Sequence, residues 1–280
     1  GTRPEEPISP PCPPLEGEGK AVIIFLLPSI YRRGPVINLE ILLPAAAIIF
    51  AAYFIRGIAG FGSGLIAVPL LALLLPLTVV VPIILITDFS ASLALGIHTR
   101  KQVRWDEIRP LLIFGVMGVV VGTTLLIKLP LTPLLITLGL LVLVFGIRSL
   151  FNIQGTRKVA RGWSAPAGFI GGTVSALFGT GGPPYVIYLN HRLRDKAELR
   201  ASFTWLFLIE GGARVVTFVV AGLLLNMELI LAILAALPLV ALGLIAGNRV
   251  HLGVSAEQMQ RLIGAILVIS GAALLWRSWP

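Results

Sequence analysis

Two glycine-rich stretches interrupt the most apolar parts of this chain and decide how it can fold. Residues 56–69 read RGIAGFGSGLIAVP, and residues 177–189 read LFGTGGPPYVIYL. Each glycine inside a helix costs about 1 kcal/mol relative to alanine, so we expect both helices to unwind there. Pro183 and Pro184 suit the first turn of a helix that restarts after the second break, because that turn requires no N–H.

The composition around these stretches is typical of an integral membrane protein. Of the 280 residues, 56% are hydrophobic and 12% are charged, and the mean hydropathy is +0.95. Soluble domains carry about 25% charged residues, so a soluble enzyme, a nucleic-acid-binding domain and a disordered chain are excluded. The apolar runs are continuous rather than alternating, which predicts an all-α polytopic membrane protein.

The order of the apolar runs repeats, which predicts two membrane repeats. A glycine-broken run and three unbroken runs are followed, after a polar linker, by the same series. We expect an N-terminal proline-rich extension with a short apolar segment at residues 1–38, repeat 1 at 39–150, a cytoplasmic linker at 151–162 and repeat 2 at 163–280. Glycines also match at one offset: Gly118, Gly122, Gly139 and Gly146 fall on Gly243, Gly247, Gly264 and Gly271. The Gly118/Gly122 and Gly243/Gly247 pairs indicate close helix packing.

The basic loops predict that the two repeats are inverted relative to each other. In repeat 1 the basic loop, residues 98–110, follows the first unbroken run, whereas in repeat 2 the basic loop, residues 190–200, follows the broken run. Lys and Arg concentrate in cytoplasmic loops, so equivalent loops should lie on opposite faces of the membrane. Loops 98–110, 151–162 and 190–200 are then cytoplasmic. The sequence leaves open whether each broken run enters and returns or crosses twice.

The two breaks predict a binding site for a small anion. A restarting helix presents free N–H groups and the positive end of its dipole, and unwound backbone at membrane depth is found where it lines a cavity. Broken helices in transporters bind anions in this way. The candidate donors are the backbone N–H groups of Ser63, Gly64, Gly181 and Gly182 and the hydroxyls of Ser63 and Thr180. Gly62, Pro183 and Arg56 complete the candidate binding residues. The alternative is that these glycines only permit close packing.

Ionisable residues inside the apolar runs are candidates for proton coupling. A charge at the bilayer centre costs about 2.5–3.5 kcal/mol, so such residues face protein or water. Asp88 and Glu210 occupy the same helix of each repeat, and either could carry a proton. For Glu210 the alternative is an internal ion pair with Arg214, four residues later. For Arg56 the alternatives are an anion contact and an extension to the membrane interface.

The sequence contains no nucleotide-binding loop, no Ser/His/Asp set and no metal-ligand cluster. We therefore predict a protein that is not an enzyme, with no catalytic residues, no cofactor and no metal. A membrane-embedded enzyme or assembly subunit remains the alternative from another functional class.

The two glycine-rich stretches resemble the paired motifs of the sulfite exporter TauE/SafE family of membrane permeases. Residues 60–69 match the first motif, with Ser63 in place of the middle of three adjacent glycines, and residues 177–189 match the second, with Thr180 where an apolar residue is common. The likeness covers about residues 39–276. It implies a multi-pass secondary transporter of the inner membrane that exports sulfite or a small organosulfonate anion, driven by an ion gradient. A passive small-anion channel is the alternative within transport. The expected partners are this anion and the lipid bilayer, not nucleic acid, and a homodimer is left open.

Overall fold

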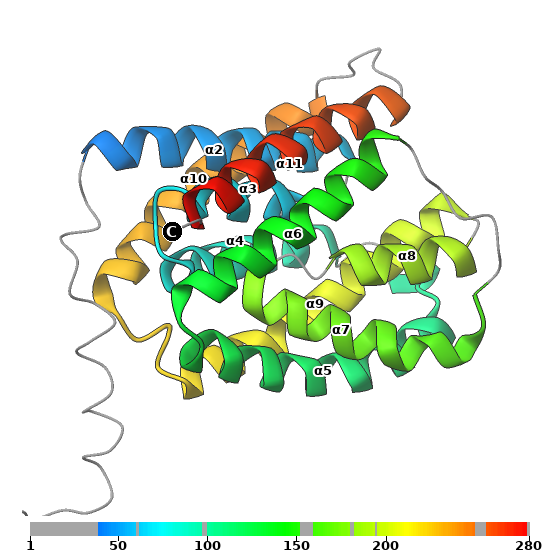
Figure 1. The fold of residues 1–280 in the computed structure, drawn as a ribbon. Helices are drawn as coiled ribbons and strands as arrows, with labels where there is room; N and C mark the ends of the chain where they lie inside the picture. Colours follow the sequence, from blue (N-terminus) through cyan, green and yellow to red (C-terminus); the bar gives the residue numbers. More distant parts are fainter. Residues whose placement is uncertain are drawn as a thin grey trace, which may run out of the picture. The chain divides into compact units, whose positions relative to one another are not determined.

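The chain folds into helices throughout the part that the computed structural model describes, which is residues 39–59, 62–96, 100–151, 159–179, 182–193, 195–249 and 256–278. The predicted N-terminal extension lies outside these residues. The described helices are α2 (Leu39–Ala59), α3 (Ser63–Ala72), α4 (Leu77–Gly96), η1 (Arg100–Gln102), α5 (Trp105–Lys128), α6 (Leu131–Leu150), η2 (Arg161–Trp163), α7 (Ser164–Phe178), α8 (Gly182–Arg192), α9 (Lys196–Val220), α10 (Met227–Arg249) and α11 (Ala256–Ser278) (Figure 1). The described residues contain no β-strand, which confirms the all-α prediction.

Six of these helices are long and apolar enough to cross a membrane, namely α2, α5, α6, α9, α10 and α11. The apolar stretches of α3 and α4, Ser63–Ala72 and Leu77–Leu93, are shorter. Large apolar side chains are exposed on α5, among them Ile113 and Met117. An outward apolar surface of this kind suits contact with lipid and not with water. The prediction of a polytopic membrane protein is confirmed.

The two halves of the chain pack across each other through their glycines. Helix α5 lies along α7, and a Cβ atom added to Gly122 would lie 2.5 Å from the carbonyl oxygen of Thr173. Helix α10 lies along α2, and a Cβ atom added to Gly243 would lie 2.8 Å from the carbonyl oxygen of Phe50. Backbones can approach this closely only where no side chain intervenes. The packing role predicted for both GxxxG pairs is confirmed.

Helices α6 and α11, the last helix of each predicted repeat, lie side by side in opposite directions (Figure 1). A Cβ atom added to Gly271 would lie 3.0 Å from the carbonyl oxygen of Gly139, and one added to Gly264 would lie 2.9 Å from that of Gly146. Equivalent residues thus exchange contacts, as they do across a two-fold axis. This antiparallel contact supports the inverted arrangement, which stays a prediction.

The second broken element, α7 followed by α8, turns back on itself. Arg161, directly before α7, lies 3.1 Å from the carboxylate of Asp106 at the start of α5. Arg192, at the end of α8, lies 2.5 Å from the carboxylate of Glu107, the next residue of α5. Both ends of the element therefore lie at the same end of α5, so α7 and α8 form a hairpin, as a segment that enters and returns would.

Candidate functional site

The two glycine-rich breaks touch each other. Gly62 precedes α3 with a φ of 97°, and Gly179 ends α7 with a φ of 64°, a left-handed conformation that favours glycine. A Cβ atom added to Gly64 would lie 2.5 Å from the carbonyl oxygen of Gly179. The breaks are therefore in direct backbone contact, although more than a hundred residues separate them in the sequence.

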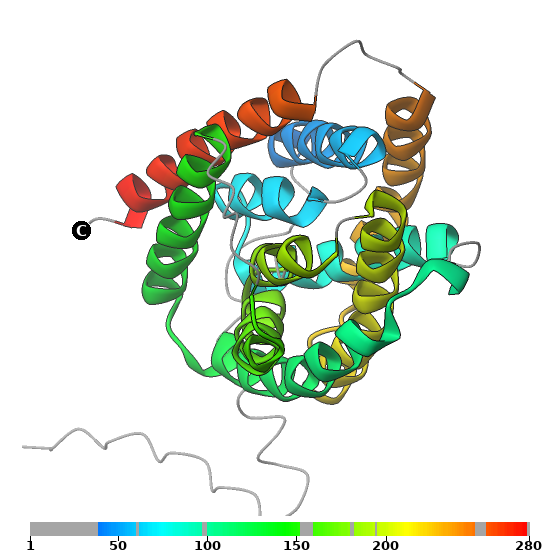
Figure 2. The same ribbon diagram turned by 90° about the vertical axis from the view of Figure 1, so that its right-hand side faces the viewer.

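The restarting helices α3 and α8 begin directly after these breaks, and longer helices surround α3 (Figure 2). Helix α8 begins at Gly182, so Pro183 and Pro184 lie in its first turn, as predicted. Two of its first N–H groups are absent for this reason. Thr180 and Gly181, two of the predicted binding residues, lie outside the described residues.

At the first break, Asp88 gathers three donors on a single carboxylate oxygen. Its Oδ1 accepts from the Tyr53 hydroxyl at 2.5 Å, from Arg56 Nη1 at 2.6 Å and from the Ser63 hydroxyl at 2.7 Å. Arg56 Nη2 donates to the hydroxyl of Ser92 at 2.9 Å. Asp88 keeps 26% of its side chain exposed, whereas the Arg56 and Ser63 side chains are buried.

This cluster changes the roles expected for two of the predicted residues. Arg56 does not extend to an interface, because its guanidinium forms an ion pair with Asp88 inside the bundle. The Ser63 hydroxyl donates to the same carboxylate, so it is not a free donor for an anion in this structure. A buried ion pair needs further hydrogen bonds to offset the desolvation of its charges, and Ser63 and Tyr53 supply them.

At the second break, Arg214 is buried and only partly satisfied. Its side chain belongs to a residue that is 6% exposed, and its Nη1 donates to the hydroxyl of Ser175 at 2.9 Å. Its Nε and Nη2 have no hydrogen-bond partner. Nη2 lies 3.9 Å from the position of a Cβ atom added to Gly179, so the unsatisfied edge of the guanidinium faces the break.

Glu210 lies one turn before Arg214 on α9 and is 1% exposed. Neither of its carboxylate oxygens makes a hydrogen bond of good geometry, although the hydroxyls of Ser175 and Tyr185 lie within hydrogen-bonding reach of the carboxylate. No salt bridge joins Glu210 to Arg214 in the described structure, because Arg214 turns towards Ser175. The alternative of a direct ion pair is therefore not seen, although the two side chains act on each other electrostatically.

Each repeat has one arginine and one serine at the same two positions, but their order is reversed. Arg56 precedes Ser92 in repeat 1, whereas Ser175 precedes Arg214 in repeat 2. Ser175 follows Arg56 by the same distance in sequence as Gly179 follows Gly60, and Arg214 follows Ser92 by the same distance as Glu210 follows Asp88. Each repeat thus forms one Arg–Ser hydrogen bond between the same two positions, in opposite directions. Sequence reasoning missed this relation, although the two offsets would have revealed it.

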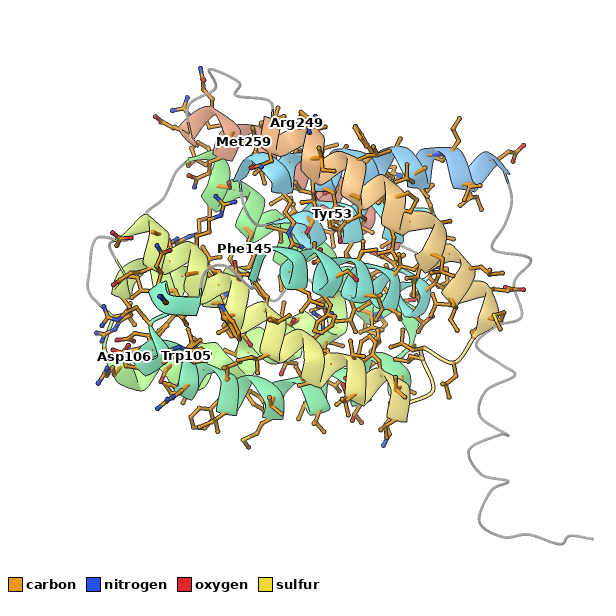
Figure 3. The ribbon with its side chains drawn as sticks, turned by 180° about the vertical axis from the view of Figure 1, so that it is seen from behind. Tyr53, Trp105, Asp106, Phe145, Arg249 and Met259 are labelled. Atoms are coloured by element: carbon orange, nitrogen blue, oxygen red, sulfur yellow. The ribbon has the colours of Figure 1, made fainter. Side chains whose placement is uncertain are left out.

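A second polar cluster, which the sequence did not predict, lies at the Asp106 end of α5 (Figure 3) and joins α5, η2, α8 and α9. The Glu107 carboxylate accepts from Arg192 Nη2 at 2.5 Å and from the Tyr188 hydroxyl at 3.0 Å. Arg104 lies 3.2 Å from Glu198 of α9. Described parts of the three loops predicted to be cytoplasmic therefore lie at one end of the bundle.

Comparisons with known proteins agree on one family. Residues 45–274 match the family described as sulfite exporter TauE/SafE. The chain is 28% identical over 198 residues to a protein of Comamonas testosteroni named probable inner membrane transporter protein TsaS, covering 70% of this chain and 83% of that protein.

It is also 25% identical over 246 residues to the probable sulfite/organosulfonate exporter TauE of Cupriavidus necator, covering 84% of this chain and 95% of that protein. No solved structure matches the chain. Because the family match includes both breaks and nearly all of the described helices, the chain belongs to the sulfite exporter TauE/SafE family.

Proposed function

We propose that the chain is a secondary transporter of the inner membrane that exports sulfite or a small organosulfonate anion. Six apolar helices support a multi-pass membrane protein. The family and the relative named as a sulfite/organosulfonate exporter support the substrate class, and the relative named as an inner membrane transporter supports the membrane. Neither relative carries an enzyme's name, which agrees with the prediction of a protein that is not an enzyme.

The anion binds where the two breaks meet, and the contact between Gly64 and Gly179 is the observation that carries this proposal. Helix α3 offers the N–H groups of Ser63 and Gly64, and helix α8 offers that of Gly182. These donors and both helix dipoles converge on a compact oxyanion. Either Asp88 or Glu210 couples proton movement to transport.

Substitution of Gly64 tests this site. The methyl group of Gly64→Ala would enter the contact with the Gly179 carbonyl oxygen at 2.5 Å, so the breaks must separate or shift. Gly162→Ala is the matched control, because no heavy atom lies within 4 Å of the added Cβ atom there. In proteoliposomes with an imposed pH gradient, we expect the wild type and Gly162→Ala to accumulate sulfite and Gly64→Ala to lose accumulation.

Both variants are first compared with the wild type by size-exclusion chromatography in detergent, so that misfolding is recognised. Sulfite accumulation by Gly64→Ala at the wild-type rate would overturn the site. Wild-type vesicles that only equilibrate sulfite, without accumulating it, would indicate a passive channel and overturn the transporter proposal.

A further inference from the structure

The two arginine–carboxylate sets at the breaks differ in how completely they are satisfied. In the first set, Asp88 Oδ1 accepts three hydrogen bonds and Arg56 donates to three oxygen atoms, those of Asp88, Ser63 and Ser92. The only polar atom of this arginine without a partner among the described contacts is Nε. The first set is a nearly closed network with little capacity for a ligand.

The second set is open. Arg214 donates one hydrogen bond, from Nη1 to Ser175, and both oxygens of Glu210 are buried without a hydrogen bond of good geometry. Buried polar groups in proteins are almost always hydrogen-bonded, so four buried atoms without a well-formed hydrogen bond, two on Arg214 and two on Glu210, require an explanation. The free edge of Arg214 faces Gly179, at the contact between the breaks. Planar guanidinium edges bind oxyanions with two parallel hydrogen bonds.

A cationic side chain would contribute more to anion binding at the second break than at the first. Helix α8 lacks the N–H groups of Pro183 and Pro184 in its first turn, so its N-terminus alone offers an anion fewer donors than that of α3. Arg214 supplies donors and charge where the helix cannot. Arg56, at the first break, faces a carboxylate instead.

We infer that Arg214 binds the substrate anion and that Glu210 is its exchangeable counter-charge, whereas Arg56 and Asp88 form a permanent structural pair. This inference rests on the proposed function and deepens it. An ionised carboxylate buried without well-formed hydrogen bonds is far more costly than the neutral acid, and a neutral Glu210 leaves the charge of Arg214 available to the anion. When Glu210 releases its proton it competes with the anion for Arg214. Protonation of Glu210 therefore favours anion binding at Arg214, and deprotonation of Glu210 favours anion release.

The groups that surround Glu210 are compatible with this exchange. Arg214 lies on the same helix, α9, Tyr185 comes from α8, and the Ser175 hydroxyl comes from α7. From α4, Asp88 acts on Arg214 electrostatically. Tyr185 is itself buried and its hydroxyl donates to the carbonyl oxygen of Gly168 at 3.3 Å. The hydroxyls of Ser175 and Tyr185 are thus shared with other partners, and neither makes a hydrogen bond of good geometry to Glu210.

The assignment of the anion-binding arginine is tested by matched lysine variants of the full chain in detergent. Lysine keeps the charge but not the planar pair of donors, so we expect Arg214→Lys to weaken sulfite binding by about tenfold in calorimetric titration. Arg56→Lys should lower the melting temperature and leave the sulfite dissociation constant unchanged. Weakened binding in Arg56→Lys together with normal binding in Arg214→Lys would overturn the assignment.

A second pair of variants keeps the test valid if either lysine variant fails to fold. Ser175→Ala removes the one hydrogen bond of Arg214, and Ser92→Ala removes the equivalent bond of Arg56. We expect weaker sulfite binding only in Ser175→Ala. Equal effects of the two serine substitutions on sulfite binding would contradict the inference.

The role of Glu210 is tested with proteoliposomes that carry Glu210→Gln or Asp88→Asn. Glutamine imitates the neutral acid, so Glu210→Gln should still bind sulfite and exchange it across the membrane but should not accumulate it in a pH gradient. Asp88→Asn should lower the melting temperature and retain pH-driven accumulation. The same buffers are used throughout, so the titration of sulfite itself cancels between variants.

Sulfite accumulation by Glu210→Gln in the pH gradient would overturn the inference and leave the proposed function intact. Absence of sulfite binding and transport in the wild type would instead remove the proposed function, and the inference with it.

Discussion

A single tyrosine hydroxyl contributes to the closed network at the first break. Tyr53 is fully buried, and its hydroxyl donates to Asp88 at 2.5 Å with the Thr87 hydroxyl 2.7 Å away. We expect Tyr53→Phe to destabilise the protein by about 1.5–3 kcal/mol, because it removes a hydrogen bond to a charged group. Thermal unfolding in detergent measures the change.

Thr124→Val is the matched control for Tyr53→Phe. The Thr124 hydroxyl is exposed and donates only to the carbonyl oxygen of Val120 in its own helix, so its removal should leave the melting temperature almost unchanged. Equal melting temperatures for Tyr53→Phe and the wild type would show that Arg56 and Ser63 alone satisfy Asp88.

Several properties of individual residues could be predicted from the sequence, and others could not. Asp88 and Glu210 were identifiable because a carboxylate inside an apolar run is costly and both fall on the same helix of the duplicated frame. The hydrogen bond from the Ser63 hydroxyl to Asp88 could not be predicted from the sequence, because it depends on how closely α3 approaches α4. The two Arg–Ser bonds were within reach of the sequence once the offsets were extended to Ser92 and Ser175.

At the scale of the element, the fold-back of α7 and α8 depends on an ion pair at its end. The Glu107 side chain is 4% exposed and holds Arg192 of α8 at 2.5 Å. Removing one partner of a buried ion pair costs about 3–5 kcal/mol, and the partial exposure of Arg192 lowers that figure. We expect Glu107→Gln to accelerate hydrogen exchange of the backbone amides in α8, measured by mass spectrometry.

Glu198→Gln is the control for this prediction. Glu198 pairs with Arg104 at 3.2 Å on the same face, but both side chains are well exposed, and such pairs contribute less than about 1 kcal/mol. Hydrogen exchange in α8 should therefore match the wild type. Equal exchange in Glu107→Gln and Glu198→Gln would mean that packing, and not this ion pair, fixes the end of α8.

The breaks themselves were predictable because glycine and proline act locally, and Pro183 and Pro184 do lie in the first turn of α8. The direction of α8 after the break was not predictable. It depends on contacts such as that between Glu107 and Arg192, which lie 85 residues apart in the sequence.

At the scale of the whole molecule, the crossed packing of the two halves joins the breaks. Helix α5 of the first half lies along α7 of the second, and α10 lies along α2, so each broken element is held by the other half of the chain. The sequence predicted the two halves from their glycine register. That the breaks meet follows only from this crossed packing, which no local pattern encodes.

The inverted arrangement makes a prediction that distinguishes it from a parallel one. The loop between α4 and α5 and the loop between α9 and α10 occupy equivalent places in the two halves. Inverted repeats put them on opposite membrane faces, whereas parallel repeats put them on the same face. Lys101 and Leu225 are exposed residues of these loops. In a Cys12→Ser background, we expect a membrane-impermeant maleimide to label Lys101→Cys only from the cytoplasmic side and Leu225→Cys only from the other side.

Gly162→Cys, near Arg161 at the Asp106 end of α5, should be labelled together with Lys101→Cys, because ion pairs hold these segments at one end of the bundle. Labelling of Lys101→Cys and Leu225→Cys from the same side would exclude inverted repeats.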